Sequence, residues 1–115
     1  MHEFSIAVQI VEQVGQIVKR HGSQKATKVV LSIGEASGIE PVALQTALQS
    51  VKTNSCMEHA TVVLQPVKAT IQCSQCQSVS PIEKEMDIYG LCPHCQGFTT
   101  IVEGREMTIK SIDVE

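Results

Sequence analysis

Four cysteines form the most specific chemical pattern in this sequence. They occur as two Cys-x-x-Cys pairs, CSQC at 73–76 and CPHC at 92–95, with 15 residues between the pairs. Each such turn brings two thiolates within reach of one ion, and two turns complete the tetrahedral set of four sulfurs that is typical of structural zinc. Because four sulfur ligands leave no open coordination position, the pattern predicts a structural rather than a catalytic zinc site. Its ligands are Cys73, Cys76, Cys92 and Cys95.

A pair of disulfides is the alternative use of these cysteines. A fifth residue, Cys56, makes the count odd, and the N-terminus lacks the basic segment and cleavage site of a secretory signal. We therefore expect a cytoplasmic protein with reduced thiols. The segment 73–97 contains few apolar side chains, so a bound metal would supply the free energy that packing cannot. Cys56 is expected to be a small buried hydrophobic residue, and His94 an exposed one beside the thiolates.

The first three residues offer a second kind of metal site. Because His2 is not small, we expect Met1 to be retained with a free amine. That amine, the amide nitrogen of His2 and its imidazole can close a five-membered and a six-membered chelate ring. The backbone amide of Glu3 can fill a fourth place, or its carboxylate can bind axially. Such nitrogen-rich, planar coordination suits Ni(II) or Cu(II) better than zinc. On this geometry alone, the alternative is that His2 is an ordinary solvated residue.

Composition limits the function classes. The 115 residues fit one compact unit, or one small domain carrying a smaller accessory one. Hydrophobic residues make up 43% and aromatic residues 3%, so the core must be aliphatic. The net charge is −3 with no basic run, which argues against nucleic acid and anionic membranes as partners. No segment is long and apolar enough to span a bilayer, and no catalytic triad, Cys/His pair or phosphate-binding loop is evident, so we do not expect an enzyme.

Hydrophobic periodicity predicts two helices and several strands. The first helix covers 4–20, with one apolar stripe. The stripe consists of Phe4, Ala7, Val8, Val11 and Val18 and is widened by Ile10, Val14 and Ile17. The second helix starts at Pro41 and buries Leu44, Ala47, Leu48 and Val51. The predicted strands cover 28–33, 60–66, 68–73, 98–102 and 106–114, with a turn at Gly104. In the last strand the apolar positions change parity near Ser111, which indicates either a bulge there or a strand buried on both faces.

These elements predict an α+β fold in which two helices pack on a small β-sheet. The last strand is expected to return to the first sheet, which makes the cysteine-rich segment an inserted zinc-ribbon domain with four cysteine ligands. The expected division is an α/β domain of residues 1–70 plus 105–115, and a zinc-ribbon domain of residues 71–104.

Three segments together resemble one known family. The start MHEFSIA, the segment IGEASGIEP and the pair CSQC…CPHC are similar, in this order, to the HypA/HybF family of hydrogenase nickel-incorporation proteins, over essentially the whole chain. The resemblance implies a nickel metallochaperone with a nickel-binding α/β domain and a zinc-ribbon domain, which delivers Ni(II) for [NiFe]-hydrogenase maturation and, in some organisms, for urease.

The resemblance also implies residue roles and partners. His2 becomes the principal nickel ligand, helped by the Met1 amine and by the backbone or carboxylate of Glu3, while Cys73, Cys76, Cys92 and Cys95 hold zinc. Glu40 matches an acidic residue that lies near the nickel site in some members. Its alternative role is to cap the helix that starts at Pro41. The implied partners are a HypB-type GTPase, the large subunit of a [NiFe]-hydrogenase and, where urease is present, the accessory protein UreE, with the chain as monomer or homodimer.

Two other functions are alternatives to a nickel metallochaperone. A zinc ribbon that binds nucleic acid would need basic and aromatic residues, but the segment 73–95 carries more acidic than basic residues and Tyr89 is its only aromatic one. A zinc-stabilised protein–protein adaptor that binds no nickel accounts for the cysteines and treats the N-terminus as incidental. It is the stronger of the two alternatives.

Overall fold

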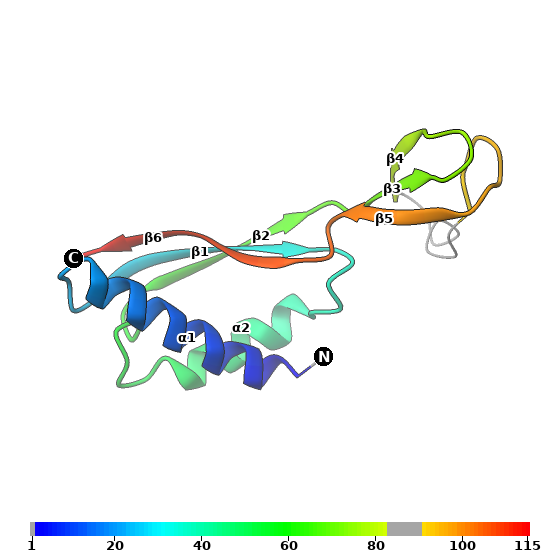
Figure 1. Cartoon of the computed structure of the whole chain (residues 1–115). Helices are drawn as coiled ribbons and strands as arrows, with labels where there is room; N and C mark the ends of the chain where they lie inside the picture. The colour runs from blue at the N-terminus through cyan, green and yellow to red at the C-terminus, as the bar shows by residue number, and fades with distance from the viewer. Residues whose placement is uncertain (1, 83–90) are drawn as a thin grey trace.

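The computed structural model describes residues 2–82 and 91–115, and it contains two small sheets joined end to end (Figure 1). The first sheet has the strand order β2-β1-β6 and the second β4-β3-β5. The elements are α1 (Glu3–Arg20), β1 (Ala26–Gly34), α2 (Pro41–Val51), β2 (Thr61–Val67), β3 (Thr70–Cys73), β4 (Val79–Pro81), β5 (Thr99–Glu103) and β6 (Met107–Val114). The radius of gyration is 17.3 Å, against about 13 Å for a compact chain of this length. The molecule is therefore elongated.

The first sheet carries both helices on one face (Figure 1). Strands β1 and β2 are parallel and α2 connects them, while β6 pairs with β1 in the antiparallel direction. The predicted return of the last strand to the first sheet is confirmed, and so is the α+β fold class. The main core residues are Ala7, Ile10, Val14, Val18, Val29, Leu31, Ile33, Leu44, Leu48 and Met57. Among the described residues, no helix combines the length and apolarity needed to cross a membrane.

The buried residues of α1 all belong to the predicted stripe. The helix buries Ala7, Ile10, Val14 and Val18, whereas Phe4 is 62% exposed and Val8 only partly buried. The prediction that Phe4 lies on the buried stripe is therefore wrong. The buried positions are spaced by three or four residues, as one helix face requires, and Phe4 lies to one side of that face. In α2 the predicted face is correct, because Leu44 and Leu48 are fully buried.

The change of parity in β6 is a bulge, as one of the two alternatives predicted. Val30 of β1 lies opposite Ser111, but the next residue, Leu31, lies opposite Ile109, so Lys110 has no partner in the ladder. The extra residue turns Ile112 back to the same side as Ile109. Both side chains pack against the core as partly buried residues.

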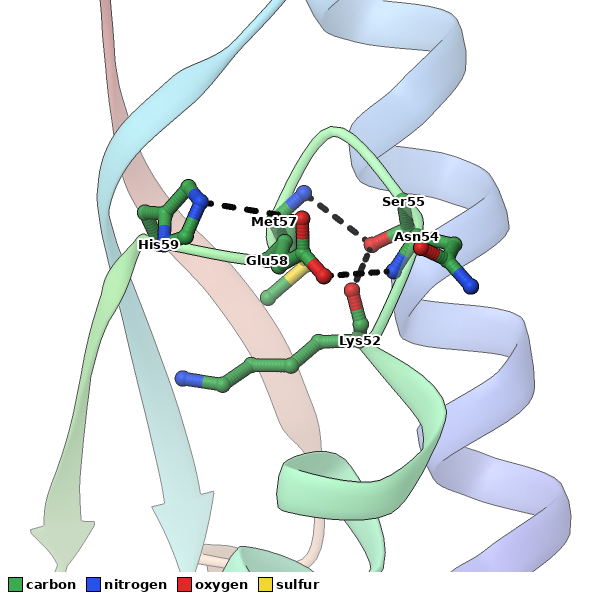
Figure 2. A network of polar contacts seen from close by, with 6 residues as sticks. All are labelled: Lys52, Asn54, Ser55, Met57, Glu58 and His59. Carbon is green, nitrogen blue, oxygen red and sulfur yellow. Dashed lines mark hydrogen bonds and ion pairs between the residues drawn. The ribbon is translucent and has the colours of Figure 1, made fainter.

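A hydrogen-bonded turn leads from α2 into β2 (Figure 2). The Ser55 hydroxyl donates to the carbonyl of Lys52 at 2.6 Å and accepts from the amide of Met57 at 3.1 Å. Met57 fills the core, and the adjacent Cys56 packs against it as a partly buried residue. The His59 side chain is 80% exposed. Cys56 thus packs as a small hydrophobic residue, as predicted, although it is partly rather than fully buried.

The second sheet is joined to the first by two short segments, 68–69 and 104–106. Strand β3 lies between β4 and β5, both antiparallel to it, and β4 is an element that the sequence pattern did not predict. At the junction Gly104 has a φ of +93°, and its carbonyl accepts a hydrogen bond from Ala36 at 2.8 Å. A side chain on Gly34 would overlap Gly104, so two backbones touch here without side chains between them.

Candidate metal centres

The four cysteines of the two knuckles lie together at the end of the second sheet. Their sulfur atoms all lie within 4.8 Å of one another. The separation is 3.4 Å between Cys73 and Cys95 and 3.7 Å between Cys76 and Cys92. Zinc–sulfur bonds of about 2.3 Å in a tetrahedron put sulfurs about 3.8 Å apart, so the four sulfurs fit one zinc ion. All of them are free thiols, and the disulfide alternative is not formed.

The two knuckles have the same backbone geometry. The amide of Gln77 donates to the carbonyl of Cys73 at 3.1 Å, and the amide of Gln96 donates to the carbonyl of Cys92 at 2.9 Å. Both glutamines have left-handed backbones, with φ of 64° and 63°. Such a turn folds the chain back after the second cysteine of each pair, so that both sulfurs of a pair point to one centre.

Backbone amides also point at the sulfurs. The amides of Gln75 and Cys76 lie 3.3 and 3.4 Å from the sulfur of Cys73, and the amide of His94 lies 3.4 Å from that of Cys92. Hydrogen bonds of this kind favour the charged thiolate over the thiol. The His94 side chain is exposed, as predicted, and this residue contacts the site through its backbone.

The surroundings of three of these thiols shift their pKa values, two downward and one upward. The Ser78 hydroxyl lowers the pKa of Cys92 to about 6, and the Cys76 amide lowers the pKa of Cys73. The Gly97 amide acts in the same direction on Cys95, but hydrogen bonding with the Cys73 sulfur and burial outweigh it and raise the pKa of Cys95 to about 12. Four negative charges cannot share this volume without a cation, so the donor set fits a divalent metal. Ser78 was not singled out from the sequence.

The N-terminal candidate site lies at the start of α1. His2 is the N-cap residue, its side chain is exposed, and it makes no capping hydrogen bond. The first hydrogen bond within the helix runs from the amide of Ile6 to the carbonyl of His2, at 3.1 Å. The amides of Glu3 and Phe4 therefore have no acceptor within the helix. Met1 lies outside the described residues. The exposed His2 side chain and the Glu3 amide thus both lie at the N-terminal end of α1.

Glu3 and Glu40, which are 37 positions apart, are brought into contact. The Glu40 amide donates to a carboxylate oxygen of Glu3 at 3.0 Å, and this bond holds the pKa of Glu3 below its ordinary value. The Glu40 carboxylate in turn accepts from the Ala43 amide at 2.7 Å, which makes it the N-cap of α2. Glu40 therefore caps α2, which is the alternative role predicted for it. The two contacts connect the first turns of both helices.

The comparisons with known proteins agree along the whole chain. The family described as "Hydrogenase/urease nickel incorporation, metallochaperone, hypA" matches residues 1–114. The hydrogenase maturation factor HypA of Aquifex aeolicus is 35% identical over 100% of this chain and 98% of its own length. That of Shewanella oneidensis is 31% identical over 100% of this chain and 96% of its own length.

A solved structure shares the fold. The solution structure of the Ni metallochaperone HypA from Helicobacter pylori aligns with a TM-score of 0.73 and 24% identity, over 99% of this chain and 97% of that one. The family match and the two relatives confirm the resemblance seen in the sequence, and the family is described as one of metallochaperones. This chain belongs to the HypA family of hydrogenase and urease nickel-incorporation proteins.

Proposed function

We propose that this chain binds Ni(II) at its own N-terminus and delivers it for [NiFe]-hydrogenase maturation. The ligands are the Met1 amine, the amide and imidazole nitrogens of His2, and the amide of Glu3. The observation that carries the proposal is the state of His2, an exposed residue at a helix end whose side chain is not used for capping. The family is described by nickel incorporation, and our proposal adds which nitrogen atoms of this chain bind the nickel.

Charge balance supports nitrogen ligands at this position. Two deprotonated amides, a neutral amine and a neutral imidazole bring the charge of bound Ni(II) to zero. A neutral complex suits a helix N-terminus, where the helix dipole disfavours a net positive charge. Because binding releases the amide protons, nickel affinity rises with pH. The exposed terminus also lets a second protein reach the ion and remove it by ligand exchange.

Glu3 and Glu40 support the site mainly by position. Their carboxylates already accept backbone hydrogen bonds, so using either as a strong nickel ligand would weaken a contact that holds the helix ends together. We infer that Glu40 fixes Glu3, and that Glu3 fixes the first turn of α1 from which His2 projects. The Glu3 backbone contributes a ligand, and its carboxylate serves as the anchor.

The four cysteines hold zinc in this proposal. Cys73, Cys76, Cys92 and Cys95 form a closed set of sulfur donors, and zinc bound there supplies folding free energy to a sheet that buries little apolar mass. The zinc is a structural cofactor, whereas nickel is the cargo. The two candidate sites have no ligand in common among the described residues.

The partners are proposed from the resemblance. They are a HypB-type GTPase, which exchanges nickel with this chain, and the large subunit of a [NiFe]-hydrogenase as recipient. UreE is the corresponding partner where urease is present. We propose no nucleic-acid partner.

Equilibrium dialysis with Ni(II) tests the nickel site. Untagged, zinc-loaded wild type is compared with the His2→Ala variant and with His21→Ala, which removes another exposed imidazole at the other end of α1. We expect one Ni(II) per chain for wild type and His21→Ala, and none for His2→Ala. Equal binding by all three proteins would contradict the proposal.

The alternative is a zinc-stabilised adaptor without nickel. One observation favours an adaptor surface: Phe98 is 76% exposed and Val79 60% exposed on the second sheet. Wild type that binds no nickel in the same dialysis would make this alternative the better account.

A further inference from the structure

An apolar pocket opens beside the start of α2, at the carboxyl ends of the parallel strands β1 and β2. Its volume is about 350 Å³. Its lining includes Ile33, Glu35, Ile39, Pro41, Leu64 and Pro66. The carboxyl ends of parallel strands are a common place for ligands in folds with a strand–helix–strand unit. The volume lies at the low end of the range of about 300–1,000 Å³ seen for small-molecule sites.

The pocket borders the candidate nickel site. Pro41 lines the pocket, and the preceding residue, Glu40, contacts Glu3 through its amide. Figure 1 places the start of α1 near the start of α2. Two large apolar side chains are exposed on the first turns of the two helices, Phe4 at 62% and Val42 at 71%. An apolar surface of this kind, rimmed by polar groups, is typical of a protein–protein contact.

Three acidic residues lie around this surface. Residues 1–18 and 29–51 contain no Lys or Arg. Glu3, Glu35 and Glu40 all lie at this end of the first sheet, and Glu35 is one of the residues that line the pocket. Basic residues gather around the opposite end of α1, at Lys19, Arg20 and Lys25, and two more, Lys68 and Arg105, stand in the segments that join the sheets. A partner at the pocket would thus meet an acidic rim.

We propose that this surface docks the protein that exchanges nickel with the chain, and that the partner presents one apolar side chain flanked by Lys or Arg. The inference rests on the nickel-binding function proposed above and adds the chemistry of the partner. The apolar side chain fills the pocket between Ile39 and Leu64, and the basic residues face Glu35 and Glu40. Docking here sets the partner's own metal ligands next to His2.

Two other occupants fit less well. Among the described residues that line the pocket, a polar small molecule would find one charged residue, Glu35, and no other polar side chain. A second copy of this chain in a two-fold symmetric contact would set Glu3, Glu35 and Glu40 against their own copies, and like charges at close range disfavour this contact.

Selection of peptides tests the proposal without assuming a partner. A phage-displayed library of random peptides is selected on zinc-loaded wild type, attached through its C-terminus at the far end of the first sheet, and bound peptides are sequenced. Dissociation constants are then measured for two surface variants, Glu35→Lys and Val42→Ser. Each variant has a control with the same substitution away from the pocket. Glu12→Lys on α1 is the control for Glu35→Lys, and Val114→Ser on β6 is the control for Val42→Ser.

We expect the selected peptides to share an apolar residue flanked by Lys or Arg. Glu35→Lys should weaken their binding about two- to fivefold, the range of an exposed charge pair, and added salt should weaken binding to wild type. Val42→Ser should cost at least about fivefold, as expected for an exposed apolar contact residue. The two controls should bind like wild type, and all four variants should keep one Ni(II) per chain.

Peptides without this pattern, or equal binding by the surface variants and their controls, would overturn the docking surface. Dimerisation of wild type that Val42→Ser abolishes would also overturn it, because the occupant would then be a second copy. Failure of wild type to bind Ni(II) in a parallel titration would overturn the nickel-binding function instead, whatever peptides are selected. The two failures are therefore distinguishable.

Discussion

Replacing Gly104 by Ala tests the close contact that joins the two sheets. Gly104 has a φ of +93°, and a Cβ added to it would lie 2.6 Å from the Cα of Ala69. Real Cβ atoms essentially never come closer than 3.0 Å to another heavy atom, and ordinary contact begins at 3.4 Å. Because the obstructing atoms belong to the backbone, the segment 104–106 must move away from the segment 68–69.

The cost follows from three contributions. A left-handed backbone costs a residue with a Cβ about 1–2 kcal/mol. Overpacking adds about 1–3 kcal/mol. Movement of Gly104 also weakens the hydrogen bond that its carbonyl accepts from Ala36, worth about 0.5–1.5 kcal/mol. We therefore expect Gly104→Ala to lower the free energy of unfolding by about 2.5–6.5 kcal/mol, a large part of the about 5–15 kcal/mol that stabilises a typical domain.

Gly22→Ala is the matched control. Gly22 also has a positive φ, of 72°, but an added Cβ would find no atom within 4 Å. Only the backbone contribution of about 1–2 kcal/mol applies to it. The assay is urea unfolding of the zinc-saturated protein, followed by the far-UV circular dichroism of the helices. If Gly104→Ala loses no more stability than Gly22→Ala, the junction is not the tight contact described here.

Three further predictions concern the zinc site, the helix cap and the fifth cysteine. Removal of zinc by a chelator should abolish the dispersed amide NMR signals of the second sheet. The helical circular dichroism should stay almost unchanged, because both helices pack on the first sheet. Loss of the helical signal would contradict this prediction. Glu40→Ala should lower the unfolding free energy by about 0.5–2 kcal/mol, because the Ala43 amide loses the carboxylate that caps it. Glu40→Asn should retain most of this free energy, because Asn is a good N-cap residue. Urea unfolding measures both variants. Burial raises the pKa of the Cys56 thiol, so its thiolate fraction at pH 8 is smaller than that of a free thiol. Iodoacetamide should therefore modify Cys56 more slowly than it modifies glutathione, with a rate that rises with pH. Mass spectrometry of the zinc-loaded protein measures this rate, and faster modification of Cys56 than of glutathione would contradict the prediction.

Local sequence signals predicted most of the elements. Hydrophobic periodicity located both helices, and Pro41 marked the first residue of α2. The change of parity near Ser111 indicated a bulge as one of two alternatives, because an extra residue reverses the sides on which a strand's side chains lie. The spacing of the cysteines predicted the cluster of four sulfurs, since the ligand geometry of zinc is encoded within each short turn.

Features that depend on distant contacts could not be predicted in this way. Phe4 belongs to an apolar pattern, but the direction in which α1 packs on the sheet leaves it exposed. The contact of Glu3 with Glu40 joins two helix ends and has no local signature. The left-handed backbones of Gln77 and Gln96 are imposed by the knuckle turns on a residue type that rarely adopts them. Ser78 lies beside the sulfurs for the same reason, through the path of the turn.

The division into a nickel-binding domain and a zinc-ribbon domain stays a prediction. The division takes 1–70 plus 105–115 as one unit and 71–104 as the other. Proteolysis of the zinc-free protein provides a test. Cleavage confined to residues 71–104, with the helices retained, is the expected result.

Calorimetric titration with Ni(II) tests the central claim, that the N-terminal nitrogens form the nickel site. The protein must be untagged and zinc-loaded, and the comparison is the same chain with its terminal amine acetylated. Acetylation keeps His2, Glu3 and Glu40 but removes the amine as a metal donor, which opens the first chelate ring. We predict one Ni(II) per chain for the native terminus and at least a tenfold loss of affinity for the acetylated chain. Equal affinity of the two proteins would contradict the account.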